Sequence, residues 1–233
     1  SDCGTISKEN KKVLSNNEIE WEQGKHTMEK ILQAKEVVKS PGIADNIEII
    51  QAIKSAGISV ISEVEFAFRY TKAKVIAITG SNGKTTTTLL VGHILKKAGL
   101  DVLVAGNIGF GFAKEIAKRD YDYIVLELSS FQLDGIKEFK PNVAIILNIT
   151  PDHLNRYEND FNKYIESKFR ITMNQEKEDV LIYNKDDKAI KKGLKTKAKK
   201  IAITLENQME ADGAFYKNNE ININLNNKKM TIQ

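Results

Sequence analysis

The sequence predicts an α/β protein built on a mostly parallel sheet. Short runs rich in Val and Ile recur along the chain, and segments with helical spacing follow them. The runs Tyr123–Leu126 and Val143–Leu147 are almost continuously apolar, which is typical of parallel strands covered on both faces. A glycine-rich turn joins a third run, Val75–Thr79, to a helical segment that begins at Lys84. This alternation favours a doubly wound arrangement.

Residues 1–72 predict a small, incomplete Rossmann-like domain. We expect strands at Ala34–Lys39 and Ile58–Ile61, with a helix between them that Asp45 caps and Gly57 closes. Two further short elements are expected here, a strand over Glu18–Trp21 and a helix over Glu63–Tyr70.

Residues 73–233 form the second predicted domain, after a linker at Thr71–Ala73. Its first helix runs from Lys84 to Lys97 and ends before Gly99. The alternating residues of Ile221–Leu225 predict a small antiparallel appendage. The remaining expected elements are helices over Phe112–Arg119 and Asp160–Met173 and strands over Val102–Val104, Val180–Tyr183 and Ile201–Thr204.

Composition indicates an ordinary globular protein, since 41% of the 233 residues are hydrophobic and 28% are charged. The formal net charge of +4 arises partly from Lys191–Lys200, a run without an aromatic residue. We expect this run to lie on a surface helix and loop and not to bind nucleic acid. A single cysteine, Cys3, fits a reducing cytoplasm, and no apolar run approaches the length of a membrane span. We therefore expect a cytoplasmic monomer without nucleic-acid or membrane partners.

The segment between Val75–Thr79 and the following helix has the layout of a phosphate-binding loop. Two glycines let backbone N–H groups turn toward an anion, and the helix points its positive end at the same place. The match to G-x-x-x-x-G-K-[ST] is incomplete, because Ile78 stands six residues before Lys84. A glycine-rich turn with an exposed lysine is the alternative. The expected nucleotide-binding residues are Gly80, Ser81, Asn82, Gly83, Lys84, Thr85 and Thr86.

Polar residues follow three other predicted strands, at the sheet edge where parallel sheets gather ligands. Asn107 follows the strand at Val102, Glu127 follows the strand at Tyr123, and His153 lies after the strand at Val143. A carboxylate, a histidine and the Thr85 hydroxyl beside a triphosphate indicate Mg²⁺, although an imidazole is an unusual ligand for this ion. Taken alone, His153 is more often a structural residue.

Four motifs, in order along the chain, resemble the Mur ligase family. They are Thr79–Thr86, Gly106–Gly109, Leu126–Leu133 and Asp152–Tyr157, with support from Ser40–Ile43 and Ser167–Ile171. Within the family, the stretch Leu126–Leu133 most resembles the member that joins D-glutamate to UDP-N-acetylmuramoyl-L-alanine. The resemblance implies ATP-dependent amide ligation through an acyl phosphate, in the synthesis of peptidoglycan precursors.

The resemblance also implies roles for individual residues. Lys84 and the loop amides would serve the β- and γ-phosphates of ATP, Thr85 and Glu127 would hold one Mg²⁺, and His153 would bind a second. Lys168 would carry a carbamate formed with CO₂ and so support the metal site; by itself it reads as a surface lysine paired with Glu166 or Glu176. Residues implied near the muramoyl peptide are Asn107, Ser129 and Gln132, and those near UDP are Asp2, Cys3 and Ser40.

The two ends of the chain predict a longer protein. Ser1–Gly4 resembles the end of a strand, and Gln233 ends another predicted strand. The resemblance implies that a C-terminal domain binding D-glutamate lies beyond Gln233, so we expect residues 1–233 not to catalyse ligation alone.

Two alternatives stay open. A P-loop ATPase acting as a binding module would carry an aspartate where this chain has Glu127. A sister ligase would use the same site with another amino acid.

Overall fold

The computed structural model describes residues 1–233 except Phe110, Asn207, Gln208, Glu210 and Gln233. The chain divides into two compact units. The first comprises Ser1–Lys39 and Ile43–Val60, and the second comprises Ser40–Gly42 and Ile61–Gln233. The strand end predicted at Gln233 lies outside the described residues.

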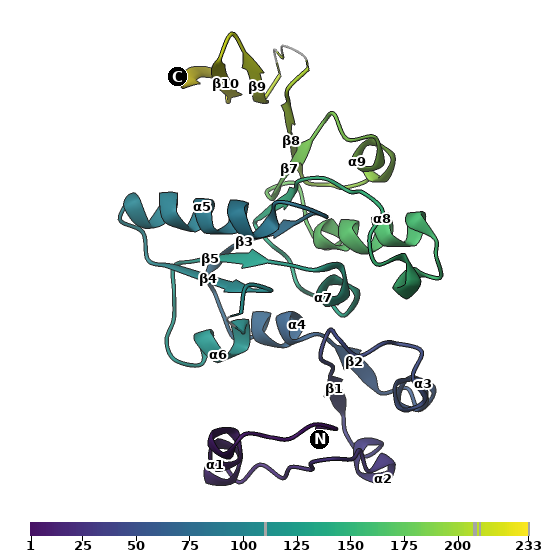
Figure 1. Ribbon diagram of the computed structural model, residues 1–233. Helices are drawn as coiled ribbons and strands as arrows, with labels where there is room; N and C mark the ends of the chain where they lie inside the picture. Colours follow the sequence, from purple (N-terminus) through teal and green to yellow (C-terminus); the bar gives the residue numbers. More distant parts are fainter. Residues whose placement is uncertain (110, 207–208, 210, 233) are drawn as a thin grey trace. The chain divides into compact units, whose positions relative to one another are not determined.

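The first unit holds short helices and most of a two-stranded sheet (Figure 1). Strands β1 and β2 lie where the sequence predicts strands and pair with each other, and α3 lies between them in the chain. Helix α1 is not predicted, and Ser7 caps it by accepting a hydrogen bond from the Asn10 N–H. The bounds are α1 Lys8–Asn16, α2 Met28–Ile31, β1 Glu36–Val38, α3 Glu48–Ser55 and β2 Ser59–Ile61.

Two predictions for this unit are wrong. Residues 18–21 form no strand. Asp45 does not cap α3, which begins at Glu48 without a side-chain cap. The Asp45 carboxylate instead pairs with the ammonium groups of Lys39 and Lys54, at 2.9 and 2.8 Å. Asp45 lies two residues before Ile47, the N-cap residue of α3, so it does not occupy the capping position.

The second unit is built on a nine-stranded sheet with the order β11-β10-β9-β8-β7-β6-β3-β5-β4. Neighbouring strands from β4 to β9 pair in parallel, whereas β9, β10 and β11 pair antiparallel. The predicted fold class, a mostly parallel α/β sheet with an antiparallel appendage, is confirmed. The bounds are β3 Lys74–Thr79, β4 Val102–Gly106, β5 Tyr123–Glu127, β6 Val143–Ile146, β7 Val180–Asn184, β8 Lys199–Thr204, β9 Gly213–Lys217, β10 Glu220–Leu225 and β11 Lys228–Ile232.

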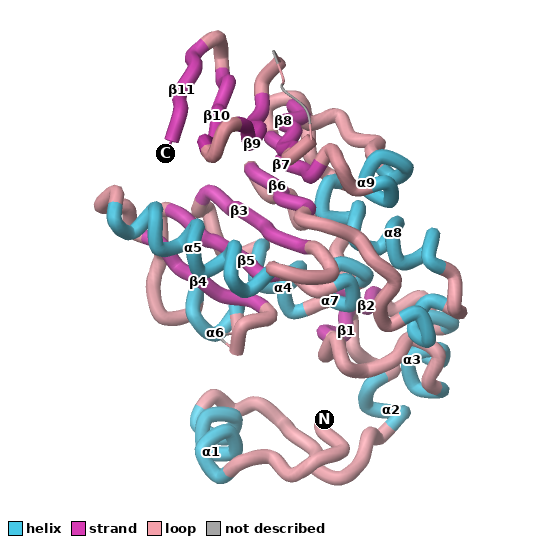
Figure 2. The backbone as a smooth tube through the Cα atoms, turned by 45° about the horizontal axis from the view of Figure 1, so that its top comes forward, coloured by secondary structure: helices cyan, strands magenta, loops and turns pink. Residues whose placement is uncertain are grey.

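Helices cover both faces of this sheet (Figure 2). Helix α5 packs on one face through Val91 and Leu95, while α4 and α6 to α9 contribute to the core on the other face. Helix α7 and a 3₁₀ helix, η1, are not predicted. The bounds are α4 Glu63–Phe68, α5 Lys84–Lys97, α6 Phe112–Ile116, α7 Ser130–Asp134, η1 Leu154–Tyr157, α8 Phe161–Phe169, η2 Arg170–Thr172 and α9 Lys188–Gly193.

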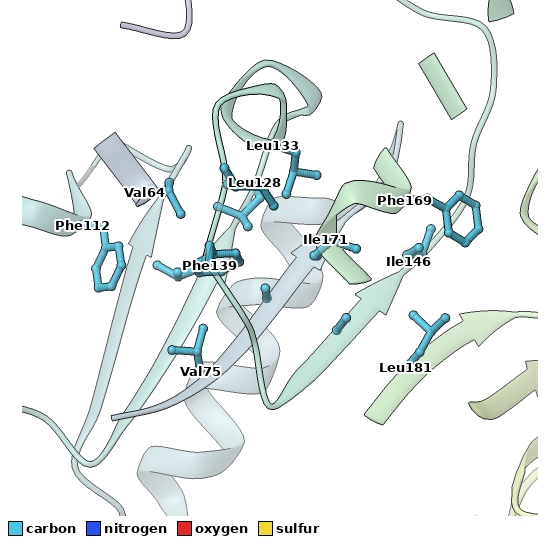
Figure 3. Close-up of a cluster of buried hydrophobic side chains, with 14 of the residues drawn as sticks. Val64, Val75, Phe112, Leu128, Leu133, Phe139, Ile146, Phe169, Ile171 and Leu181 are labelled. Atoms are coloured by element: carbon cyan, nitrogen blue, oxygen red, sulfur yellow. The ribbon is translucent and has the colours of Figure 1, made fainter. Parts of the chain in front are cut away.

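The main hydrophobic core lies between the sheet and helices α4 and α6 to α9 (Figure 3). Strand residues alternate between faces, so Val75 and Ala77 point into this core while Ile78 packs on the α5 side. Phe139 and Leu133 are fully buried in the core. Burial of such side chains stabilises the fold by about 1.5–3 kcal/mol each. The strand ends that carry the predicted site residues are thereby fixed.

Helix α4, placed in the first domain by the sequence, packs within the second unit. Its buried Glu65 carboxylate accepts hydrogen bonds from the N–H groups of Lys137, Glu138 and Phe139. The compact units therefore do not divide at residue 72, and the proposed limits of the ligand-binding domains, 1–72 and 73–233, stay a prediction.

The basic run Lys191–Lys200 occupies the end of α9, a loop and the start of β8. Within the described ranges, no helix has the length and apolar character that spanning a membrane requires.

Candidate nucleotide-binding and catalytic site

The loop between β3 and α5 exposes a helix N-terminus that no side chain caps among the described residues. Gly83 occupies the N-cap position with φ of 81°, a left-handed conformation that glycine adopts without steric cost. The first-turn N–H groups of α5 and the positive end of its dipole therefore point out of the loop. This geometry suits a phosphate group.

The loop after β6 stabilises the conformation of the predicted phosphate-binding loop, Gly80–Thr86, called the phosphate loop below. The Asn148 side chain accepts a hydrogen bond from the Asn82 N–H and donates to the Asn82 carbonyl, at 2.9 and 3.0 Å. The Ser81 hydroxyl donates to the Thr150 carbonyl at 2.9 Å and accepts from the Thr150 N–H at 3.0 Å. Two predicted nucleotide-binding residues, Ser81 through its hydroxyl and Asn82 through its backbone, thus lie in a preformed network. Asn148 is not among the predicted site residues, although it follows a predicted strand.

Two lysines meet at the start of this loop. The Lys84 ammonium donates to the carbonyls of Gly80 and Ser81, at 3.0 and 2.8 Å. The Lys168 ammonium donates to the same Gly80 carbonyl at 2.8 Å. Because Lys168 is only 2% exposed, its interpretation as a surface lysine is wrong; Glu176 pairs with Lys197 instead.

Burial, and then the charge of Lys84, lower the pKa of Lys168 to about 7, against the opposing effect of Asp152 and Asp134. A neutral amine is therefore accessible near neutral pH at the wall of the phosphate loop.

Glu127 ends β5 and is 2% exposed. Its carboxylate accepts hydrogen bonds from the Thr85 hydroxyl at 2.6 Å and from the Asn107 amide at 3.0 Å. Gly106 makes this approach possible, because a Cβ there would collide with the Glu127 backbone oxygen. The structure thus brings together Thr85, Glu127 and Asn107, as predicted. A hydroxyl and a carboxylate are oxygen ligands of the kind Mg²⁺ uses beside phosphates, so this pair fits that ion.

His153 lies at the start of η1 with a left-handed φ of 50°. Its ring is 5.4 Å from the ring of Phe131, and its Nε2 is 3.4 Å from a carboxylate oxygen of Asp152. Over the part of the chain that the structure describes, no three His, Cys, Asp or Glu side chains gather in a way that could hold a metal ion. The second metal site at His153 stays a prediction.

Ser129 and Gln132 form the capping box of α7. The Ser129 hydroxyl accepts from the Gln132 N–H, and the Gln132 side chain accepts from the Ser129 N–H at 3.0 Å. The spacing Ser-x-x-Gln is a sequence signature of this cap, so the helix was open to prediction.

The residues implied near UDP fall in both compact units. In the first, the Asp2 carboxylate accepts from the Gly4 N–H at 2.7 Å, and the Cys3 sulfur lies 2.8 Å from His26 Nε2. Ser40 belongs to the second unit, beside Pro41 and Gly42. Their ligand contacts stay predictions.

Two protein families match this chain. The family described as the Mur ligase middle domain matches residues 78–233, which include the phosphate loop, Glu127, His153 and Lys168. The chain belongs to the Mur ligase family. A second family, described as the MurD N-terminal domain, matches residues 1–49.

Curated relatives carry the name UDP-N-acetylmuramoylalanine–D-glutamate ligase. One from Christiangramia forsetii is 50% identical over 235 residues, which cover 100% of this chain and 53% of the relative. Another from Bacteroides fragilis is 53% identical over 194 residues, covering 83% of this chain and 44% of the relative. The chain therefore spans about half the length of these Mur ligases.

Solved Mur ligase structures share the fold. The UDP-N-acetylmuramate:L-alanyl-gamma-D-glutamyl-meso-diaminopimelate ligase from Neisseria meningitides aligns with a TM-score of 0.61 at 14% identity, covering 98% of this chain and 76% of that chain. The MurF ligase from Thermotoga maritima in complex with ADP aligns with a TM-score of 0.52 at 15% identity, covering 87% of this chain and 58% of that chain.

Proposed function

We propose that the complete protein joins D-glutamate to UDP-N-acetylmuramoyl-L-alanine in an ATP-dependent reaction of peptidoglycan precursor synthesis. The observation that carries this proposal is the pair of Thr85 and Glu127, 2.6 Å apart beside the uncapped N-terminus of α5. The names of relatives that are about half identical to this chain support the choice of substrates.

In this proposal the phosphate loop, Gly80–Thr86, binds the triphosphate of ATP. The α5 N–H groups and the Lys84 ammonium neutralise the β- and γ-phosphates, since phosphoryl transfer depends on positioning and charge. Thr85 and Glu127 would hold Mg²⁺, which when bound screens the repulsion between the phosphates and the attacking carboxylate. A muramoyl-alanine carboxylate oxygen attacks the γ-phosphorus, and the bond to the ADP oxygen breaks. The amine of D-glutamate then attacks the acyl carbon of the acyl phosphate, forming the amide, losing a proton and releasing phosphate.

Lys168 is the proposed site of a carbamate. The neutral amine attacks the carbon of CO₂, an N–C bond forms, and the nitrogen loses a proton. The product is an anion where a cation stood, and it would reinforce a second Mg²⁺ held by His153. Burial of Lys168 beside Gly80 supports this role, since the amine is fixed close to the phosphate loop.

The substrate contacts follow the same pattern. We assign the muramoyl peptide to Asn107, Ser129 and Gln132, which follow the carboxyl ends of β4 and β5 in the chain. We assign the uridine diphosphate to Asp2, Cys3 and Ser40. We also propose that the protein is a monomer and acts in the cytoplasm.

A coupled assay of phosphate release by the complete protein tests the proposal. With ATP, Mg²⁺ and UDP-N-acetylmuramoyl-L-alanine present, release should depend on D-glutamate. Dependence on meso-diaminopimelate or L-lysine instead would assign the protein to a sister ligase. ATP hydrolysis without any amino acid acceptor would favour an ATPase binding module.

A further inference from the structure

Arg156 joins two segments that are far apart in the chain. Its guanidinium donates hydrogen bonds to the carbonyls of Gly42 at 3.2 Å and Pro41 at 3.4 Å. The same guanidinium lies over the ring of Phe131 in α7, with its Cζ 4.5 Å from the ring centroid. All of these residues belong to the second compact unit.

Each contact of Arg156 lies next to a residue with a proposed substrate role. Ser40 directly precedes Pro41 in the bonded turn. Phe131 stands between the capping-box residues Ser129 and Gln132. Arg156 itself lies in η1, three residues after His153. One side chain therefore connects three segments that would recognise different parts of one extended substrate.

Further contacts fix the position of the Phe131 ring under the Arg156 guanidinium. Its ring stacks on Tyr157 with an interplanar angle of 12° and a centroid distance of 6.1 Å. The Tyr157 hydroxyl in turn donates to the Asp134 carboxylate at 2.9 Å, within α7. His153 lies 5.4 Å from the same Phe131 ring. Displacement of Arg156 would therefore change the positions of both the Ser40 turn and His153.

Arginine is specifically suited to this position. Its planar guanidinium can lie on an aromatic face and donate to two carbonyls at once, whereas a lysine ammonium offers one compact charge and no plane.

We propose that Arg156 is a positioning residue for the nucleotide-sugar substrate. It fixes the turn of residues 40–42 against α7 and the His153 segment, so that both ends of the substrate meet their contacts in register. The inference rests on the proposed function for the identity of the substrate. It predicts an effect on that substrate and not on ATP, because the phosphate loop is held by Asn148 and Thr150 instead.

The test compares Arg156→Ala and Arg156→Lys with Arg119→Ala and Arg119→Lys in the complete protein. Arg119 is a matched control, since its guanidinium also lies over a ring, 3.8 Å from the Tyr121 centroid, but bonds to Asp101 before β4. We expect Arg156→Ala to raise the KM for UDP-N-acetylmuramoyl-L-alanine about tenfold, the equivalent of one misplaced contact. The KM for ATP should stay within about twofold, and neither KM should change in the Arg119 variants.

A second readout does not depend on catalysis. Amide hydrogen exchange over residues 40–44 should accelerate about tenfold in Arg156→Ala and stay unchanged in Arg119→Ala. Arg156→Lys should fall between Arg156→Ala and the unaltered protein in both readouts, and it guards against a variant that fails to fold.

Equal rises in both KM values, or unchanged KM values and exchange rates, would overturn the inference. If the unaltered protein does not use this substrate, the proposed function fails, while the exchange readout still decides whether Arg156 fixes the turn.

Discussion

Two lysine ammonium groups share the carbonyl oxygen of Gly80. Like charges this close raise the cost of protonating the more buried one, and Lys168 is almost fully buried. The arrangement is costly in the absence of an anion. A negatively charged phosphate group bound at the loop would offset that cost. This is a physical reason why both lysine side chains lie here.

The lowered pKa of Lys168 makes a prediction about stability. Between about pH 7 and the pKa of 10.5 of an ordinary lysine, the unfolded chain binds a proton that the folded chain lacks. The free energy of unfolding therefore rises with pH in this window, by at most about 1.4 kcal/mol per pH unit. Relative to Lys168→Met, the protein should gain about 2 kcal/mol between pH 7.5 and 9.5 in urea denaturation. A difference between the two proteins that does not change with pH would contradict the burial argument.

Lys84→Ala should sharply reduce ATP-dependent turnover in the complete protein, because the loop loses the side-chain charge that we propose acts on the terminal phosphates. We expect kcat/KM to fall by about 10²–10³ or more, as on removal of a group that stabilises transition-state charge. The control is Lys96→Ala, an exposed lysine in the last turn of the same helix. Turnover within a few-fold of normal in Lys84→Ala would show that the loop does not act as proposed.

At the scale of elements, the contact between β4 and β5 fixes the side of the site where we propose that Mg²⁺ binds. Gly106 has φ of 100°, and a side chain there would meet the backbone oxygen of Glu127. Gly99 also has a positive φ, 81°, but nothing lies within 4 Å of its Cβ position. Substitutions at these two glycines therefore distinguish the free-energy cost of backbone strain from the cost of a steric collision.

Gly99→Ala should therefore destabilise the protein by about 1 kcal/mol, the cost of a left-handed alanine. Gly106→Ala should cost about 2 kcal/mol more, because the collision adds to that strain and displaces Glu127. Urea denaturation of the two variants measures the difference. Equal destabilisation would mean that β4 can retreat from Glu127 without penalty.

The elements themselves could largely be predicted from the sequence. Apolar runs identify β3, β5 and β6, and Gly99 correctly ends α5. Helix α1 was missed because it buries no residue, so it lacks the apolar stripe on which helix prediction depends. The predicted cap at Asp45 is wrong for a different reason, since α3 begins three residues later, at Glu48, and the position of a helix start is poorly defined by local patterns.

At the scale of the whole molecule, topology explains which parts of the site were predictable. Parallel strands bring their carboxyl ends to one edge, so the meeting of Thr85, Asn107 and Glu127 follows from the strand order. The contacts of Asn148 with the loop and of Arg156 with residues 41 and 42 depend on loop paths, which periodicity does not encode. Burial of Lys168 likewise depends on how α8 packs, and only the family resemblance suggested a role for it.

The proposed role of this site is to activate a carboxylate for ligation to D-glutamate. Its most direct test is to incubate the complete protein with ATP, Mg²⁺ and UDP-N-acetylmuramoyl-L-alanine, with and without D-glutamate, and to measure both phosphate and the amide product. We expect one phosphate to be released per amide formed, and both products to be lost when either substrate is omitted. Phosphate release that continues unchanged without D-glutamate, with no amide product, would contradict it.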